Sequence, residues 1–85
     1  MAYQILLRPR ALRDLEGLPL KIKLRMEKAI DALRENPRPP GSKKLVGFED
    51  EWRMRVGRYR VLYMIDDRDR SVTVARVAHR REAYR

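Results

Sequence analysis

The chain has 85 residues, and its 21 lysines and arginines against 12 acidic residues give it a formal net charge of +9. This length predicts one domain over residues 1–85, and so basic a balance predicts an anionic partner such as nucleic acid or an acidic protein. The chain has no cysteine and one histidine, so we expect no disulfides, no metal site and no other cofactor. It has no apolar run of membrane-spanning length and no signal-peptide core, so we expect a cytoplasmic protein.

The first half of the chain predicts one strand and two helices. Residues 3–8 form a short apolar run that predicts a strand. Pro9 suits the first turn of a helix, which we expect to end near Gly17. The apolar stripe of this helix is Ala11, Leu12 and Leu15. Pro19 starts a second helix, which must stop by Asn36 because the next residue is a proline. Its apolar positions follow the helical period and are Ile22, Met26, Ala29, Ile30 and Leu33.

The middle of the chain is a turn-rich connection, a short segment and an acidic patch. Residues 37–42 read Pro-Arg-Pro-Pro-Gly-Ser, a linker that is too short to separate two domains. Residues 43–48 are interpreted as a short edge segment. The acidic residues that follow are Glu49, Asp50 and Glu51.

Residues 52–63 predict a tight β-hairpin that places arginines side by side. Apolar residues alternate with arginines, as in a strand with one buried face. Gly57 and Arg58 are predicted to form a two-residue turn, with glycine at the first central position as a type II′ turn requires. The resulting register pairs Val56 with Tyr59, Arg55 with Arg60, Met54 with Val61, Arg53 with Leu62 and Trp52 with Tyr63. Two arginines across a sheet repel each other, so Arg55 opposite Arg60 indicates an anion site, where guanidinium groups match phosphate oxygens.

A last, β-branched strand is predicted over residues 71–78, after a polar turn over residues 66–70. If that turn centres on Arg68 and Asp69, Ile65 pairs with Val72 and Arg60 pairs with Val77. This register places His79 on the same face as Arg60. The basic face is then expected to carry Arg53, Arg55, Arg60 and His79.

These elements predict a two-layer α+β domain: an N-terminal strand, two helices, and then consecutive antiparallel strands in one small sheet. The helices must bury their apolar stripes against one face of that sheet. Trp52, Tyr59 and Tyr63 share this face and are predicted to belong to the core. The other face keeps the arginines.

Four stretches carry a resemblance to a known family. Residues 33–37 read Leu-Arg-Glu-Asn-Pro, residues 44–47 read Lys-Leu-Val-Gly, residues 52–63 form the arginine hairpin, and residues 79–85 read His-Arg-Arg-Glu-Ala-Tyr-Arg. Over essentially its whole length the chain resembles the RelE/ParE superfamily of bacterial and archaeal toxins, and its C-terminal residues favour the RelE-like branch. The resemblance implies the toxin of a type II toxin–antitoxin module. Such a toxin enters the ribosomal A site and cuts messenger RNA, and an acidic antitoxin holds it inactive in a complex.

The resemblance also implies roles for particular residues. Arg60 and Arg80 match positions that bind the scissile phosphate, and Arg53 and Arg55 match positions that flank it. Tyr84 matches a tyrosine that stacks on a base and fixes the sugar. In the hairpin turn, Arg58 is a further candidate for substrate binding, although Arg53 and Arg58 also suit ordinary solvated strand positions.

The identity of the general base is open. Cleavage without a metal needs a base for the ribose 2′-hydroxyl, cations for the charge that builds on phosphorus, and an acid for the leaving oxygen. Studied RelE toxins carry lysines where this chain has Arg53 and Arg55, and arginine is a poor base. His79 can act as base or acid, and a carboxylate of the acidic patch, Glu49, Asp50 or Glu51, is the alternative. We take His79 as the acid–base residue.

Two other functions fit the same pattern. ParE-like toxins share this architecture, generally lack the histidine–arginine–tyrosine set, and inhibit DNA gyrase by binding rather than by chemistry. A plain RNA-binding module would harm no cells and need no acidic partner. Either toxin function implies an antitoxin segment, expected to be an acidic amphipathic helix, that covers the basic face.

Overall fold

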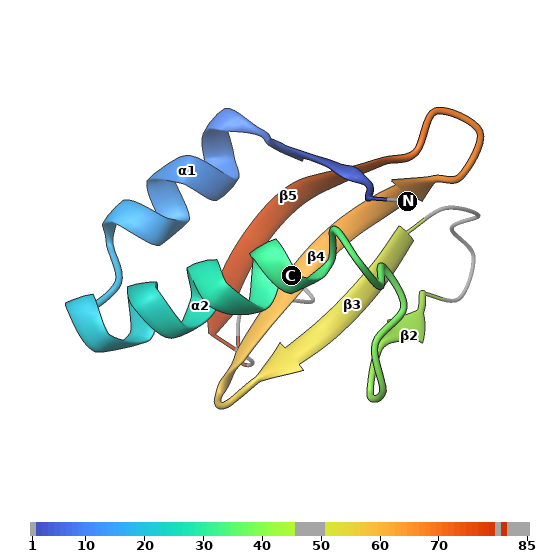
Figure 1. The fold of residues 1–85 in the computed structure, drawn as a ribbon. Coiled ribbons are helices and arrows are strands. Elements are labelled where there is room, and N and C mark those ends of the chain that lie inside the picture. The colour runs from blue at the N-terminus through green and yellow to red at the C-terminus, as the bar shows by residue number, and fades with distance from the viewer. Residues whose placement is uncertain (1, 46–50, 80, 82–85) are drawn as a thin grey trace.

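The computed structural model describes residues 2–45, 51–79 and 81, and arranges them in two layers (Figure 1). In chain order the elements are β1 (Gln4–Leu7), α1 (Pro9–Glu16), α2 (Leu20–Ala32), β2 (Lys43–Lys44), β3 (Glu51–Val56), β4 (Tyr59–Asp66) and β5 (Ser71–His79). The strands form one five-stranded sheet, and both helices lie on the same face of it. The predicted α+β architecture is therefore confirmed.

The sheet is mixed rather than purely antiparallel. Its strand order is β1-β5-β4-β3-β2, and β1 runs parallel to β5 while the other neighbours are antiparallel. β1 is the edge strand beside β5, although both helices and three strands separate the two in the sequence. A short edge segment is predicted over residues 43–48. Its first two residues form the edge strand β2, and residues 46–48 lie outside the described part of the chain.

Both helices begin at the predicted prolines, and α1 ends at the predicted glycine, whereas α2 ends at Ala32, before the predicted limit at Asn36. Pro9 is the first residue of α1, Gly17 caps its C-terminus, and Pro19 immediately precedes α2. One prediction about α1 is wrong: Leu12 is 44% exposed, whereas Ala11 and Leu15 are buried. The stripe of α1 is narrow because this short helix lies mainly along β5 at one side of the sheet.

The core lies between the helices and the sheet. Its helical part is Ala11, Leu15, Met26, Ile30 and Leu33, and its strand part is Met54, Val61, Tyr63, Ile65, Val72, Val74 and Val77. Tyr63 is 1% exposed, and its hydroxyl donates a hydrogen bond of 2.8 Å to the carbonyl of Pro37. This bond joins β4 to the start of the linker that follows α2.

Tyr63→Phe is expected to lower the free energy of unfolding by about 1 kcal/mol, because the variant loses a buried hydrogen bond and keeps the ring. Burial raises the pKa of the Tyr63 hydroxyl above its ordinary value of 10.0. A raised folded-state pKa stabilises the wild type fully below pH 10, and this contribution is lost as the pH rises through the folded-state value. The difference between wild type and variant should therefore narrow in alkaline solution. Urea unfolding at pH 7 and above pH 10 measures it, with Tyr59→Phe as the control.

The β3–β4 hairpin has the predicted register, including Arg55 opposite Arg60. Gly57 has a φ of +60°, while Arg58 is not among the described residues with positive φ, as expected for a type II′ turn. A side chain at Gly57 would be strained by this φ, and its Cβ would lie 3.2 Å from a guanidinium nitrogen of Arg25. The backbone conformation therefore favours glycine here, and any other side chain would also displace the end of Arg25.

The β4–β5 pairing departs from the predicted register halfway along. Ile65 pairs with Val72 as predicted, but Arg60 pairs with Ala78 and not with Val77. The cause is a β-bulge: Tyr63 pairs with Val74 and the preceding Leu62 pairs with Arg76, which leaves Ala75 as an extra residue on β5. Every residue after the bulge is displaced by one position, so its side chain changes face.

Candidate functional site

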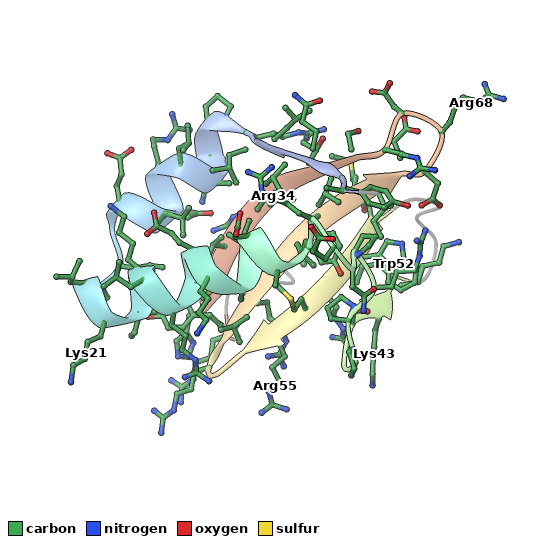
Figure 2. The ribbon with its side chains drawn as sticks, in the orientation of Figure 1. Lys21, Arg34, Lys43, Trp52, Arg55 and Arg68 are labelled. Carbon is green, nitrogen blue, oxygen red and sulfur yellow. The ribbon has the colours of Figure 1, made fainter. Side chains whose placement is uncertain are left out.

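The sheet face opposite the helices carries a basic groove of about 680 Å³. Its lining residues are Gly41, Lys43, Arg53, Arg55, Gly57 and Arg60. Four of them are cationic, and none of the described lining residues is acidic. Figure 2 shows Lys43 and Arg55 projecting to the same side of the molecule. We call this surface the basic groove.

The register of three neighbouring strands builds the groove. Lys43 on β2 lies opposite Arg53 on β3, and Arg55 on β3 lies opposite Arg60 on β4. Cross-strand partners have Cβ atoms about 5 Å apart, so each pair holds two positive charges close together. Guanidinium groups stay charged at any physiological pH. The groove is therefore a rigid positive surface whose local potential attracts polyanions.

The linker after α2 closes one side of the groove and is held by an ionic cluster. Arg38 donates to both carboxylate oxygens of Asp67, at 3.2 and 2.7 Å, and Tyr3 donates to the same carboxylate at 2.7 Å. The Arg38 guanidinium also lies 5.2 Å from the centre of the Trp52 ring, within cation–π range. These contacts tie the linker to β3 and to the β4–β5 turn, which Tyr3 also binds from just before β1, and so fix the backbone that leads to Gly41.

Asp67→Asn is expected to destabilise the fold at neutral pH and to have no effect in acid. The hydrogen bonds from Arg38 and then from Tyr3 hold the pKa of the Asp67 carboxyl below its ordinary value of 3.8. A lowered folded-state pKa contributes stability above the unfolded-state value, and this contribution is lost as the pH falls through the folded-state value. Thermal unfolding at pH 7 and below pH 3 measures both. Because the cluster is exposed, the shift in midpoint at pH 7 should be small; an equal shift at both pH values would contradict this origin.

His79 is not on the basic face. It pairs with Tyr59, and the two rings meet edge to face with centroids 5.4 Å apart and an interplanar angle of 76°. The Nδ1 atom of His79 accepts a hydrogen bond of 3.3 Å from the backbone N–H of Arg81. The prediction that His79 shares a face with Arg60 is therefore wrong, because the bulge at Ala75 turns the end of β5 over.

Other predicted site residues are also separated from the basic groove. Arg58 lies at a smaller apolar pocket on the helix side of the hairpin, with Tyr59 and residues of α2. Glu51 pairs with Met64 at the far end of β3 and lines a different pocket. Four predicted residues, Glu49, Asp50, Arg80 and Tyr84, lie outside the described part of the chain. The described residues contain no cluster that could hold a metal ion and no helix that is long and apolar enough to cross a membrane.

The sequence interpretation missed Lys43. A two-residue strand has no alternation from which the face of a side chain can be predicted. One signal was present: two lysines stand in a row, so in an extended segment one of them must point to each face. The pairing of β2 with β3 shows which lysine points into the groove: Lys43 lies opposite Arg53, whereas Lys44 lies opposite Trp52.

The mixed five-stranded sheet with two helices on one face is the fold of solved RelE toxins. Residues 5–84 match the family of the ParE toxin of the type II toxin–antitoxin system parDE. Toxin RelG from Mycobacterium tuberculosis is 35% identical over 86 residues, which cover 100% of this chain and 99% of that protein. The chain belongs to the RelE/ParE family of type II toxins, and within it is RelE-like.

Solved structures of relatives have the same fold. The toxin–antitoxin complex RelBE2 from M. tuberculosis matches with a TM-score of 0.80 and 33% identity, covering 93% of this chain and 99% of that one. The archaeal RelE–RelB complex from Pyrococcus horikoshii matches with a TM-score of 0.85 and 27% identity, covering 98% and 100%. Both relatives were crystallised with a RelB antitoxin.

Proposed function

We propose that this protein is a ribosome-dependent endoribonuclease that cuts messenger RNA in the A site and so inhibits translation. The observation that carries the proposal is the basic groove, in which Arg53, Arg55 and Arg60 share one rigid face with Lys43 and no acidic residue is among the described lining. A phosphodiester fits such a surface, because its oxygens accept hydrogen bonds from several guanidinium groups at once.

The reaction follows from the chemistry of RNA without a metal. The ribose 2′-hydroxyl loses its proton and its oxygen attacks the adjacent phosphorus, the bond from phosphorus to the 5′-oxygen breaks, and a 2′,3′-cyclic phosphate and a 5′-hydroxyl result. Charge builds on the phosphate oxygens during the attack. Arg55 and Arg60 are proposed to stabilise this charge, with Arg53 beside them. By resemblance, Arg80 is proposed to complete the phosphate site, and Tyr84 to stack on a base.

The acid–base role predicted for His79 is not carried into the proposal, because His79 lies at the end of β5 against Tyr59 and is not among the described residues that line the basic groove. His79→Gln should therefore cleave RNA at the wild-type rate. Markedly slower cleavage by this variant would restore the predicted role.

The partner is proposed to be an antitoxin that covers the basic groove. Relatives crystallise with RelB antitoxins, and a surface this positive favours an acidic amphipathic segment. Such a toxin works in the cytoplasm, where ribosomes and the antitoxin are found.

Cleavage of a messenger RNA on purified ribosomes stalled with an open A site tests the proposal. Wild type is compared with Arg60→Ala, and the same RNA without ribosomes is the control. Cuts that need the ribosome and disappear in Arg60→Ala support the proposed activity. RNA left intact by the wild type contradicts it.

Inhibition of DNA gyrase by binding is the second candidate, favoured by the match to the ParE toxin family over residues 5–84. A gyrase supercoiling assay with the wild-type protein separates the two. Inhibition of supercoiling together with intact RNA on ribosomes would establish the second candidate.

A further inference from the structure

The basic groove offers four cations but only one whose proton can be removed. Arginine stays protonated under all physiological conditions and cannot act as a general base. This excludes Arg53, Arg55 and Arg60 from accepting a proton. Lysine differs, because its amine loses one proton to become a neutral nucleophile or base, and proteins use it in that role. Lys43 is the only such residue among the described residues that line the groove.

The other described candidates for a base point elsewhere. His79 contacts Tyr59 on the helix side of the sheet. Glu51 lines a separate pocket with Trp52 and Met64 at the far end of the hairpin. Neither is among the residues that line the basic groove. A proton acceptor beside a phosphate bound in the groove must therefore come from Lys43 within this part of the chain.

The position of Lys43 suits that role. It lies directly across from Arg53, and neighbouring strands are about 4.8 Å apart, so its amine can reach a ribose whose phosphate contacts the arginines. Its side chain is exposed on an edge strand, which leaves room for RNA. The preceding linker is fixed by the Arg38–Asp67 ion pair, so the backbone that carries Lys43 is held in place.

We propose that Lys43 is the general base of RNA cleavage, an assignment that rests on the proposed endoribonuclease activity. The lone pair of the neutral Lys43 amine takes the proton of the 2′-hydroxyl, and the 2′-oxygen forms its bond to phosphorus. The 5′-oxygen leaves with the electrons of the broken bond and takes a proton from water. The Lys43 ammonium group then returns its proton to solvent, so the reaction is balanced without a co-reactant.

Single-turnover cleavage on stalled ribosomes, measured between pH 6 and pH 9, tests the assignment. Lys43→Arg keeps the positive charge and removes the base. We expect the rate to fall about 100-fold and the wild-type rise of rate with pH to flatten. Binding of an oligonucleotide with a 2′-deoxyribose at the cleavage position should change less than about twofold, because phosphate contacts remain. Lys44→Arg, the neighbouring lysine paired with Trp52, is the matched control and should cleave at the wild-type rate.

A second variant separates a chemical role from a structural one. Lys43→Ala should be rescued by added ethylamine, which can enter the vacated space and accept the proton, whereas Arg60→Ala should not be. Wild-type cleavage by Lys43→Arg overturns the assignment but leaves the endoribonuclease intact. A slow Lys43→Arg with an unchanged pH profile, or the absence of rescue, also overturns it. If the wild type cuts no RNA, both the activity and the assignment fail.

Discussion

The double variant Arg55→Ala, Arg60→Ala is expected to lose RNA cleavage by at least about 100-fold and to be no less stable than the wild type. The two guanidinium groups are directly opposed across β3 and β4, and both line the basic groove. Removal of one donor that stabilises a developing oxyanion commonly slows an enzyme 100-fold to 1,000-fold. Removal of two like charges from opposed positions relieves repulsion in the sheet. Activity should therefore fall without an accompanying loss of stability.

Cleavage on stalled ribosomes and thermal unfolding measure the two effects on the same samples. Arg13→Ala, Arg68→Ala is the charge-matched control, because both residues are exposed and lie outside the basic groove. A control that loses as much activity would show that net charge, and not the groove, explains the loss. A marked fall in the midpoint of the double variant would show that the opposed pair stabilises the sheet.

The same double variant should also bind the antitoxin more weakly. If an acidic segment covers the basic groove, two of its cationic contacts disappear, and affinity should depend less steeply on salt than in the wild type. Titration calorimetry at two salt concentrations measures this. Unchanged affinity would place the antitoxin elsewhere on the toxin.

The sequence predicted what depends on local pattern. Strict alternation and one glycine gave the β3–β4 register, so the opposition of Arg55 and Arg60 followed from residue spacing alone. Proline likewise gave the start of both helices, and glycine gave the end of α1. The presence of a basic face that binds anions was also predictable, because charged side chains on alternate residues of a strand lie on the same face.

The features that were missed depend on partners distant in sequence. The parallel pairing of β1 with β5 brings together residues 67 positions apart, and a four-residue strand does not encode its neighbour. The bulge did leave a signal: the buried valines of β5 are Val72, Val74 and Val77, and the spacing of three breaks the alternation. Strict alternation through β5 ignores this break and therefore places His79 on the wrong face.

The bulge has a specific support in α1, and Asp14→Ala is expected to lower the free energy of unfolding by about 2 kcal/mol. One carboxylate oxygen of Asp14 accepts the backbone N–H of Val77 at 2.9 Å and lies 3.4 Å from the Arg76 guanidinium. β1 pairs with β5 only as far as Val74. Just after the bulge, the Asp14 carboxylate thus accepts the backbone N–H that a neighbouring strand would otherwise bind. A hydrogen bond to a charged acceptor contributes about 1.5–3 kcal/mol to the free energy of unfolding.

Urea unfolding and amide hydrogen exchange at Val77 measure this effect. Asp14→Asn keeps an oxygen that can accept the Val77 N–H and should lose less stability than Asp14→Ala. Asp31→Ala removes an exposed ion pair with Arg34 and should change stability by less than about 1 kcal/mol. Fast exchange at Val77 only in Asp14→Ala would show that α1 holds the bulge in place. Because the bulge decides the face of every later residue of β5, α1 would then also determine that His79 contacts Tyr59 and leaves the basic groove to the lysine and the arginines.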